Sequence, residues 1–243
     1  MGGARALDAI LQDSVDTPCV NPALVGSLEA LAERYGISRA DQEAWARRSH
    51  RLAGAAPEAG SGRLPVATGN RKAAAILHSD EYALLEDLEG LPLLPGARTL
   101  TAGTCAPLAD GAAALVLAPR GASRPLARIL GLQRATHPGP LGALPAIQGL
   151  LTRTGVALAD LDCIELEETS AVQVLALLQT LPGLSPDRVN LEGGSLARGH
   201  AGGAAGLRLV VDLIHQLGPG ALGLAALSTA DGQGAALLLE RLP

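Results

Sequence analysis

The sequence predicts an α/β protein in which helices pack against a buried sheet. First, segments with the apolar pattern of strands alternate with segments of helical periodicity through the second half of the chain. Second, the 243 residues are 48% hydrophobic, with a mean hydropathy of +0.25, but they include no Phe and only 1% aromatic residues. The core must therefore be built from Ala, Leu, Val and Ile, which suits closely packed helices and a buried sheet.

The first part of the chain is expected to be mainly helical. Residues 22–36 carry apolar side chains at helical spacing and end at a glycine. Ser38, followed by Asp41, has the pattern of an N-cap, and a helical face continues from there to about residue 56. Three further segments follow: an irregular Pro- and Gly-rich connection at 56–70, a short helix at 82–89 and a loop at 91–96.

Strands and helices alternate from residue 112 onward. Apolar runs bounded by Pro or Gly predict buried strands, and longer amphipathic runs predict helices. The expected strands are residues 112–118, 127–135, 161–166, 187–191, 223–227 and 235–240. The expected helices are residues 143–154, 169–181 and 207–217, and a hairpin turn at 228–234 joins the last two strands.

Charge and cysteine usage exclude several classes of protein. A net charge of -5 and scattered Lys and Arg residues argue against a nucleic-acid partner. Cys19, Cys105 and Cys163 are too far apart for a disulfide framework or a zinc cluster, which favours a reducing cytoplasm. No apolar run approaches membrane-spanning length and the N-terminus lacks a secretory pattern. We therefore expect a soluble, cytoplasmic protein without a membrane partner.

One stretch, residues 189–206, combines six glycines with a histidine and the start of an expected helix. His200 is placed near a helix N-terminus, where the positive end of the dipole disfavours the imidazolium form. A neutral imidazole can accept a proton, so His200 is a candidate general base. A histidine that only satisfies local backbone groups is the equally weighted alternative. The stretch does not have the spacing of a dinucleotide-binding loop.

This stretch resembles the histidine motif of the thiolases, which make or cleave β-ketoacyl-CoA thioesters. The shared pattern is Asn-x-x-Gly-Gly-x-x-Ala-x-Gly-His-x-x-Gly-Ala-x-Gly. Residues 164–173 are similar to the family's Ile-Glu-Leu-Asn-Glu-Ala-Phe-Ala-Ala-Gln, and residues 228–234 to its Cys-x-Gly-Gly-Gly-Gln-Gly. Residues 99–114 are similar to its Thr-Val-Thr-Ala-Gly-Asn-Ala-Ser-Gly-x-Asn-Asp-Gly-Ala-Ala-Ala. The four blocks also occur in the family's order.

The resemblance implies a thiolase-like fold of two βαβαβαββ halves. Residues 119–243 would form the complete C-terminal half. Residues 1–118 would form the end of the N-terminal half, with a helical insertion that covers CoA at about 22–90. On this reading the chain begins after the region that carries the family's nucleophilic cysteine, without which no group can take the acyl chain from the thioester.

The resemblance also indicates where CoA would lie. Arg71 and Lys72 could meet its phosphates, since anionic oxygens need charge-assisted donors, although a solvated basic turn is the plainer interpretation. Thr104 and Ala106 stand where the family places polar residues beside CoA. We expect CoA or acyl-CoA to act as a substrate, and we expect no tightly bound cofactor and no metal.

Two catalytic positions of the family are changed. Ser228 stands in place of the cysteine that acts as acid and base, and a hydroxyl exchanges protons near neutrality far less readily than a thiol of pKa ~8.5. Glu167 stands in place of the asparagine that positions an oxyanion-stabilising water, where a carboxylate would repel negative charge. The acidic residues Glu165, Glu167 and Glu168 are more simply explained as a solvated face than as metal ligands.

Three interpretations follow from these changes. The first is a thiolase-like protein that is catalytically incompetent alone and serves as a structural or regulatory subunit. The second is one subunit of a split acyltransferase whose partner supplies the nucleophile. The third is a fragment of a decayed gene. Strand edges left by an incomplete sheet predict a homo-oligomer, or a hetero-oligomer with another thiolase-like subunit.

Overall fold

A four-stranded mixed sheet in the second half of the chain organises the fold. The computed structural model describes residues 22–57, 62–69, 75–78, 80, 88, 90–119, 121 and 124–243. The sheet contains β3 (Ala127–Thr136), β4 (Cys163–Leu166), β5 (Leu222–Ser228) and β6 (Gln233–Arg241), in the order β3-β6-β5-β4. The β5–β6 and β3–β6 pairs are antiparallel, and the β4–β5 pair is parallel.

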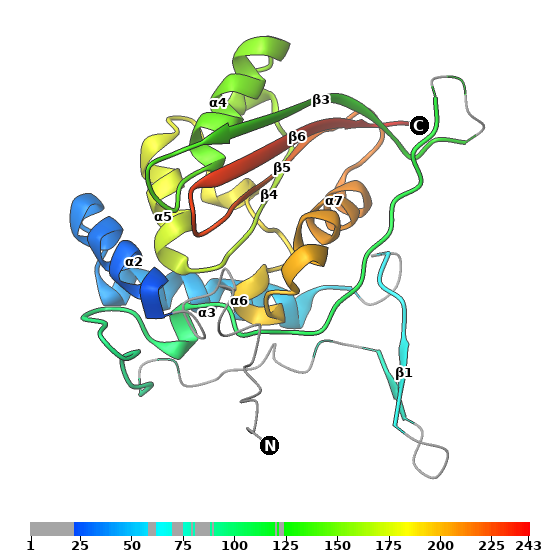
Figure 1. Cartoon of the computed structure of the whole chain (residues 1–243). Helices are drawn as coiled ribbons and strands as arrows, with labels where there is room; N and C mark the ends of the chain where they lie inside the picture. Colours follow the sequence, from blue (N-terminus) through cyan, green and yellow to red (C-terminus); the bar gives the residue numbers. More distant parts are fainter. Residues whose placement is uncertain are drawn as a thin grey trace, which may run out of the picture.

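Helices cover both faces of this sheet (Figure 1). The helix α4 (Ala143–Thr154) packs on β3 and β6, and α7 (Ala205–Gln216) packs on β5 and β4 from the opposite side. Successive side chains of each strand accordingly point to opposite faces of the sheet. Ile164 of β4 and Leu224 of β5 face the larger apolar cluster, whereas Cys163 and Ala225 face the cluster around α7. This period of two confirms the predicted α/β layering.

The N-terminal helices pack on the sheet domain through α5 (Ala171–Thr180). Both α2 (Pro22–Tyr35) and α3 (Arg39–Ala55) contact α5, and α3 also contacts the short helix α6 (Ser195–Arg198). The predicted start of α3 is confirmed, because Ser38 and Asp41 form a reciprocal capping box. Glu29 of α2 accepts hydrogen bonds from the backbone N–H groups of residues 98–100, which holds that loop against the helix.

Two predicted strands are not formed. Residues 112–118 run across the surface outside any ladder, and residues 187–191 are reduced to a 3-10 turn (Pro186–Arg188) and one parallel bridge between Val189 and Ile164. Both runs are apolar enough for a strand, but a strand also needs a neighbour, and the described part of the chain offers none to 112–118 and only one residue of pairing to the other.

The remaining predictions for the first half have mixed outcomes. The connection expected to be irregular at 56–70 contains β1 (Val66–Thr68), which pairs with β2 (Ala75–Leu77) in a short hairpin that projects from the molecule (Figure 1). The helix expected at 82–89 lies almost wholly outside the described residues. None of the described helices is long and apolar enough to cross a lipid bilayer.

Candidate functional site

The candidate site lies at the sheet edge where β4 and β5 end. These strands are parallel, with Leu166 opposite Ala226, so the residues that follow them emerge at the same edge. Glu167 continues the ladder by donating its backbone N–H to the carbonyl of Ala226, at 3.0 Å. Ser228 is the last residue of β5. Two of the three predicted catalytic positions are therefore brought to one edge by strand pairing alone.

His200 reaches this region from a loop that is fixed by its backbone. Its N–H donates to the carbonyl of Pro107 at 2.7 Å, and its carbonyl accepts from Ala109 at 3.1 Å. The preceding Gly199 has φ +83, which disfavours a side chain, and a Cβ there would collide with that of Ala109. The glycine thus lets the loop lie directly against residues 107–109.

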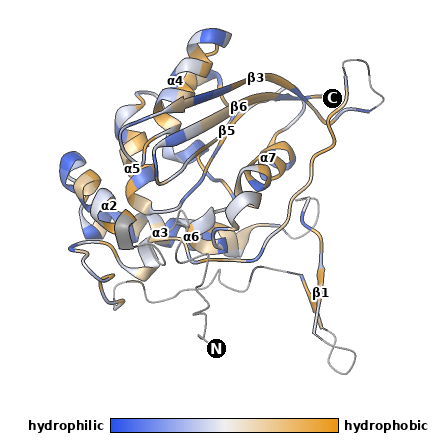
Figure 2. Cartoon of the chain, in the orientation of Figure 1, coloured by the Kyte–Doolittle hydropathy of each residue, from blue (hydrophilic) through white to orange (hydrophobic). Residues whose placement is uncertain are grey.

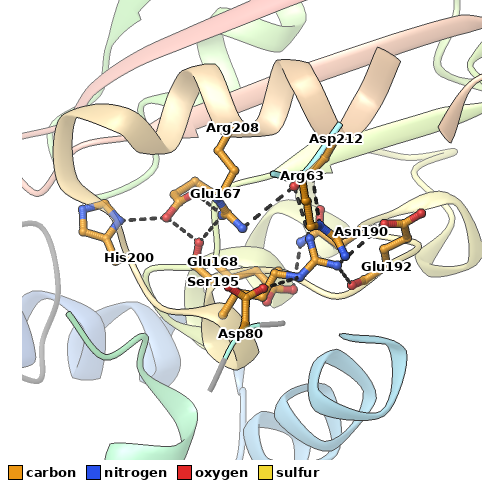
Figure 3. A network of polar contacts seen from close by, with 12 residues as sticks. Arg63, Asp80, Glu167, Glu168, Asn190, Glu192, Ser195, His200, Arg208 and Asp212 are labelled. Carbon is orange, nitrogen blue, oxygen red and sulfur yellow. Dashed lines mark hydrogen bonds and ion pairs between the residues drawn. The ribbon is translucent and has the colours of Figure 1, made fainter. Parts of the chain in front are cut away.

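The imidazole of His200 is held by the carboxylate of Glu167 (Figure 3). The Nδ1 and Oε1 atoms are 2.8 Å apart. The same carboxylate accepts from Ser195 Oγ at 2.7 Å and from Arg208 Nη2 at 3.3 Å. Burial raises the pKa of Glu167, but the hydrogen bond with His200 and the charge of Arg208 outweigh it, so the pKa lies below its ordinary value. The carboxylate is therefore ionised, and with Nδ1 facing it, Nε2 is the ring nitrogen left for other chemistry.

Sequence reasoning missed two members of this arrangement. Arg208 on α7 bonds both Glu167 and the hydroxyl of Ser195, the latter at 2.5 Å. The repulsion expected from a lone carboxylate is thus reduced by a neighbouring guanidinium. A signal was present in the sequence, because Arg208 and Asp212 have i,i+4 spacing in an otherwise apolar helix. No comparable sequence pattern distinguishes Ser195.

The ionic contacts continue from Arg208 along α7 (Figure 3). Asp212 lies 4.0 Å from Arg208 and 3.3 Å from Arg198, as measured between the charged atoms. Arg198 also bonds the carbonyl of Glu192, whose carboxylate pairs with Arg63. Alternating charges therefore neutralise one another beneath α7, which explains how several ionisable groups can be buried together.

The acidic run at the end of β4 was predicted to be solvated, and this was wrong. Glu165, Glu167 and Glu168 are all buried. Glu168 accepts hydrogen bonds from Trp45 Nε1, Asn190 Nδ2, Ser49 Oγ and the backbone N–H of Leu196. These donors come from elements far away in sequence, so local pattern could not reveal them. In the described part of the chain, no group of three or more His, Cys, Asp or Glu side chains could hold a metal ion.

Glu165 is the least compensated of the three acids. It is only 1% exposed, and its Oε1 has no hydrogen-bond partner among the described residues. Burial raises the pKa of Glu165 to about 8, and the negative charge of Asp212 adds to the shift. Its carboxyl group is consequently protonated over most of the physiological pH range.

Ser228 has a structural partner. Its Oγ accepts a 2.9 Å hydrogen bond from the backbone N–H of Ala143, the first residue of α4. Gly142, at the N-cap position of that helix, has no side chain to supply this acceptor. The hydroxyl therefore satisfies one of the unpaired N–H groups at a helix N-terminus.

The two predicted CoA-binding residues that the structure describes, Thr104 and Ala106, are both buried. Thr104 is buried, and its hydroxyl is bonded within its own turn, to Thr101. Ala106 is fully buried and donates its N–H to the carbonyl of Thr169. Arg71 and Lys72 lie outside the described residues.

The layered sheet and the glycine-flanked histidine at the strand ends define a thiolase-type α/β protein. Residues 1–121 match the family model of the N-terminal domain of thiolase, and residues 123–241 match that of its C-terminal domain. The chain belongs to the thiolase family.

Individual relatives agree with this assignment. The chain is 37% identical to the acetyl-CoA acetyltransferase of Escherichia coli K12, over 100% of this chain and 66% of the relative. It is 40% identical to a β-ketoadipyl-CoA thiolase of Pseudomonas putida, over 87% of this chain and 58% of the relative. The crystal structure of an Ascaris suum thiolase in complex with coenzyme A superposes with a TM-score of 0.79 and 27% identity, over 99% of this chain and 66% of that one. The chain thus spans about three fifths of these relatives.

Proposed function

We propose that this chain is a thiolase-family protein that does not catalyse thiolysis by itself and acts as a structural or regulatory subunit of a thiolase-like assembly. The observation that carries the proposal is the contact between Ser228 Oγ and the N–H of Ala143. The position that holds an acid/base thiol in the resembling motif is here a helix cap.

The chemistry of the hydroxyl supports this proposal. A thiol of pKa ~8.5 can be deprotonated and reprotonated near neutrality, whereas an aliphatic hydroxyl is too weak an acid for that role. The acceptor contact with the helix N-terminus also engages one of the two lone pairs of the hydroxyl oxygen. Ser228 is thus suited to stabilising α4 and poorly suited to proton exchange.

Glu167 supports the proposal independently. An asparagine at this place can offer an N–H to a water or an oxyanion, whereas an ionised carboxylate only accepts hydrogen bonds. Glu167 accepts hydrogen bonds from Ser195 and Arg208 and contacts the imidazole of His200. The residue therefore holds the loop of His200 in place and offers no donor to developing negative charge.

A CoA ester is the ligand that we propose for this subunit. The support is the family membership and the relative from Ascaris suum that was solved with coenzyme A. Calorimetric titration of the purified chain with CoA and with acetoacetyl-CoA tests this part of the proposal. Saturable heat that is absent with adenosine alone is expected, and the absence of binding would contradict the choice of ligand.

The Glu167–His200 contact favours one alternative function. A carboxylate at Nδ1 fixes the tautomer of an imidazole and leaves Nε2 able to accept a proton. Such a pair could activate a thiol that another chain provides, which is the split acyltransferase considered above. Under that alternative, Ser228 would be the one residue of the acyltransferase site that is poorly suited to its role, which is proton exchange.

Acetoacetyl-CoA cleavage in the presence of free CoA tests the catalytic part of the proposal. We expect no turnover from the purified chain above the rate of a buffer blank. Turnover that is abolished in His200→Ala would contradict the proposal. It would show that a group on this chain, such as the buried Cys105, acts as nucleophile.

A further inference from the structure

A row of polar side chains interrupts the apolar contact between α7 and β4. Figure 2 shows hydrophilic residues among the hydrophobic ones along α7. Three polar residues recur at every fourth position and therefore share one face of this helix: Arg208, Asp212 and Gln216. Three residues alternate along β4 and just beyond it, on the face that packs with α7: Cys163, Glu165 and Glu167. We call these two rows of side chains the polar seam.

The two ends of the polar seam fix how its rows face each other. At one end Arg208 Nη2 donates to Glu167 at 3.3 Å, and at the other end Cys163 Sγ donates to Gln216 Oε1 at 3.2 Å. Four residues of helix advance about 6 Å and two residues of strand about 7 Å, so the rows stay in step between these ends. The acids in the middle of the two rows are therefore brought opposite each other.

These two acids, Asp212 and Glu165, are buried, at 4% and 1% exposed. Two carboxylates that face each other in a buried site do not both ionise, because no water screens the second charge from the first. Asp212 lies 3.3 Å from Arg198 and 4.0 Å from Arg208, so it takes the negative charge. Glu165 Oε1 has no hydrogen-bond partner among the described residues. Burial, and after it the charge of Asp212, raises the pKa of Glu165. Glu165 is therefore the acid that holds the proton.

The charged groups around this pair leave no cation for a second ionised carboxylate. They come from several elements: Arg208 and His215 on α7, Arg198 on α6, Arg63 before β1, and Glu167, Glu192 and Asp80 (Figure 3). The three guanidinium groups are already engaged in ion pairs with carboxylates, and His215 lies against Gly62. Within the part of the chain that the structure describes, an ionised Glu165 would thus have to take an arginine from an acid that already uses it.

The polar seam also holds the loop of His200. Arg198 lies two residues before His200 and pairs with Asp212, while Arg208 bonds Glu167, the partner of the imidazole. A separation of α7 from β4 and α6 would break both attachments.

We propose that the polar seam is a proton-dependent clasp: α7 and the loop of His200 stay closed on β4 while the pair of buried acids holds a proton, and they open as that proton is lost. The inference goes beyond the proposed function, because it concerns how His200 is held and requires no thiolysis.

Hydrogen exchange of the amides of residues 195–201 in the full chain tests the clasp, once it is corrected for the intrinsic effect of pH on exchange. The pKa of Glu165 is about 8 in the closed state and near 4.5 in water, so the closed state holds a proton that the open state releases. Opening should become about tenfold more favourable for each pH unit between these values and level off above them. Protection of residues 195–201 should fall accordingly from pH 5 to pH 8.

Urea separates this local opening from global unfolding. At urea concentrations below the unfolding transition, exchange of residues 195–201 should not respond to urea, because little surface is exposed when the clasp opens. The amides of α4, which packs on the opposite face of the sheet, are the reference and should respond to urea. Equal sensitivity of the two segments to urea would overturn the proposal, because exchange at 195–201 would then report global unfolding.

Two substitutions test the pair of acids. Glu165→Gln has no proton to release, so it should reduce the total change in protection between pH 5 and pH 8 by at least about a hundredfold. Asp212→Asn removes the opposing charge and leaves Arg198 and Arg208 to pair with Glu165, so it should reduce the change by at least about tenfold. Asp187→Asn, at an exposed position, is the control and should keep the wild-type dependence.

Three further results would overturn the proposal. The first is wild-type protection at 195–201 that does not change with pH. The second is a fall in Glu165→Gln as large as in the wild type. The third is the full wild-type dependence in Asp212→Asn, which would show that the two acids do not act on each other.

Discussion

Trp45 and Glu168, 123 residues apart in sequence, are joined by a hydrogen bond of 2.9 Å from the indole Nε1 to Oε1 of the carboxylate. Both side chains are buried. Trp45 lies on α3 and Glu168 follows β4, next to the residue that holds His200. Helix α3 is therefore joined directly to the segment that carries Glu167, the partner of His200.

Trp45→Phe should destabilise the protein by about 1–3 kcal/mol, because it leaves a buried carboxylate with one donor fewer. Urea unfolding measures the change. Tyr35→Phe is the control, since the Tyr35 hydroxyl makes no hydrogen bond within the described part of the chain, and its effect should be within about 0.5 kcal/mol. Equal effects of the two substitutions would show that the Trp45–Glu168 bond adds nothing beyond aromatic packing.

Arg208→Met should destabilise the protein by roughly 2–4 kcal/mol at pH 7, because it leaves the buried charge of Glu167 without its guanidinium partner. The folded-state pKa of Glu167 is lowered, so the stability that this residue contributes is present above its unfolded value of 4.5 and is lost as the pH falls through the folded value. The effect of the substitution should consequently shrink as acidic pH protonates Glu167.

The control for this experiment is Arg134→Met, at an exposed position of β3, which should change stability little at either pH. Chemical unfolding of both variants at pH 7 and at acidic pH supplies the comparison. A loss from Arg208→Met that does not depend on pH would mean that Arg208 acts by packing and not by its charge.

Glu165→Gln should stabilise the protein at alkaline pH. The folded-state pKa is raised to about 8 from 4.5, so between these values the folded state holds a proton that the unfolded state has released. Wild-type stability therefore falls as the pH rises through this window, by an amount on the order of a few kcal/mol. Glutamine mimics the protonated acid and removes the dependence.

Thermal unfolding between pH 4 and pH 9 measures this difference. The variant and the wild type should be alike near pH 4 and diverge towards pH 9. Asp187→Asn, at an exposed position, is the control and should change stability little. Parallel stability curves for Glu165→Gln and wild type would refute the idea that Glu165 is buried in its neutral form.

Local signals predicted the parts of the fold that depend on neighbouring residues. The capping box of Ser38 and Asp41 and the helix from Ala143 to Thr154 are visible in short stretches of sequence, and both are formed. Residues 112–118 have a strand pattern but no strand, because pairing depends on a second segment that no local pattern can supply.

In the candidate site, too, local sequence predicted some residues, whereas contacts between distant segments could not be predicted. His200 was predicted from its glycine-rich stretch, and Ser228 from the resemblance to the thiolases. The strand order explains why Glu167 and Ser228 share an edge. The environment of the acids could not be predicted, because their donors come from α3, α6 and α7 and meet only in the folded chain. For the same reason the capping role of Ser228 became visible only with α4 in place.

Ser228→Cys tests the central claim most directly, by restoring a thiol at the position that now caps α4. The measurement is the rate of acetoacetyl-CoA thiolysis by the variant and by the wild type, in whatever assembly the purified protein forms, with Glu167→Asn added in a second variant. Because Ser228 caps α4 and the carboxylate of Glu167 can only accept hydrogen bonds, we expect no measurable gain in the thiolysis rate from either variant. A gain within the ~10²–10⁴ range of a positioned acid/base group would contradict the account and identify the chain as part of a thiolase that lacks only its second cysteine.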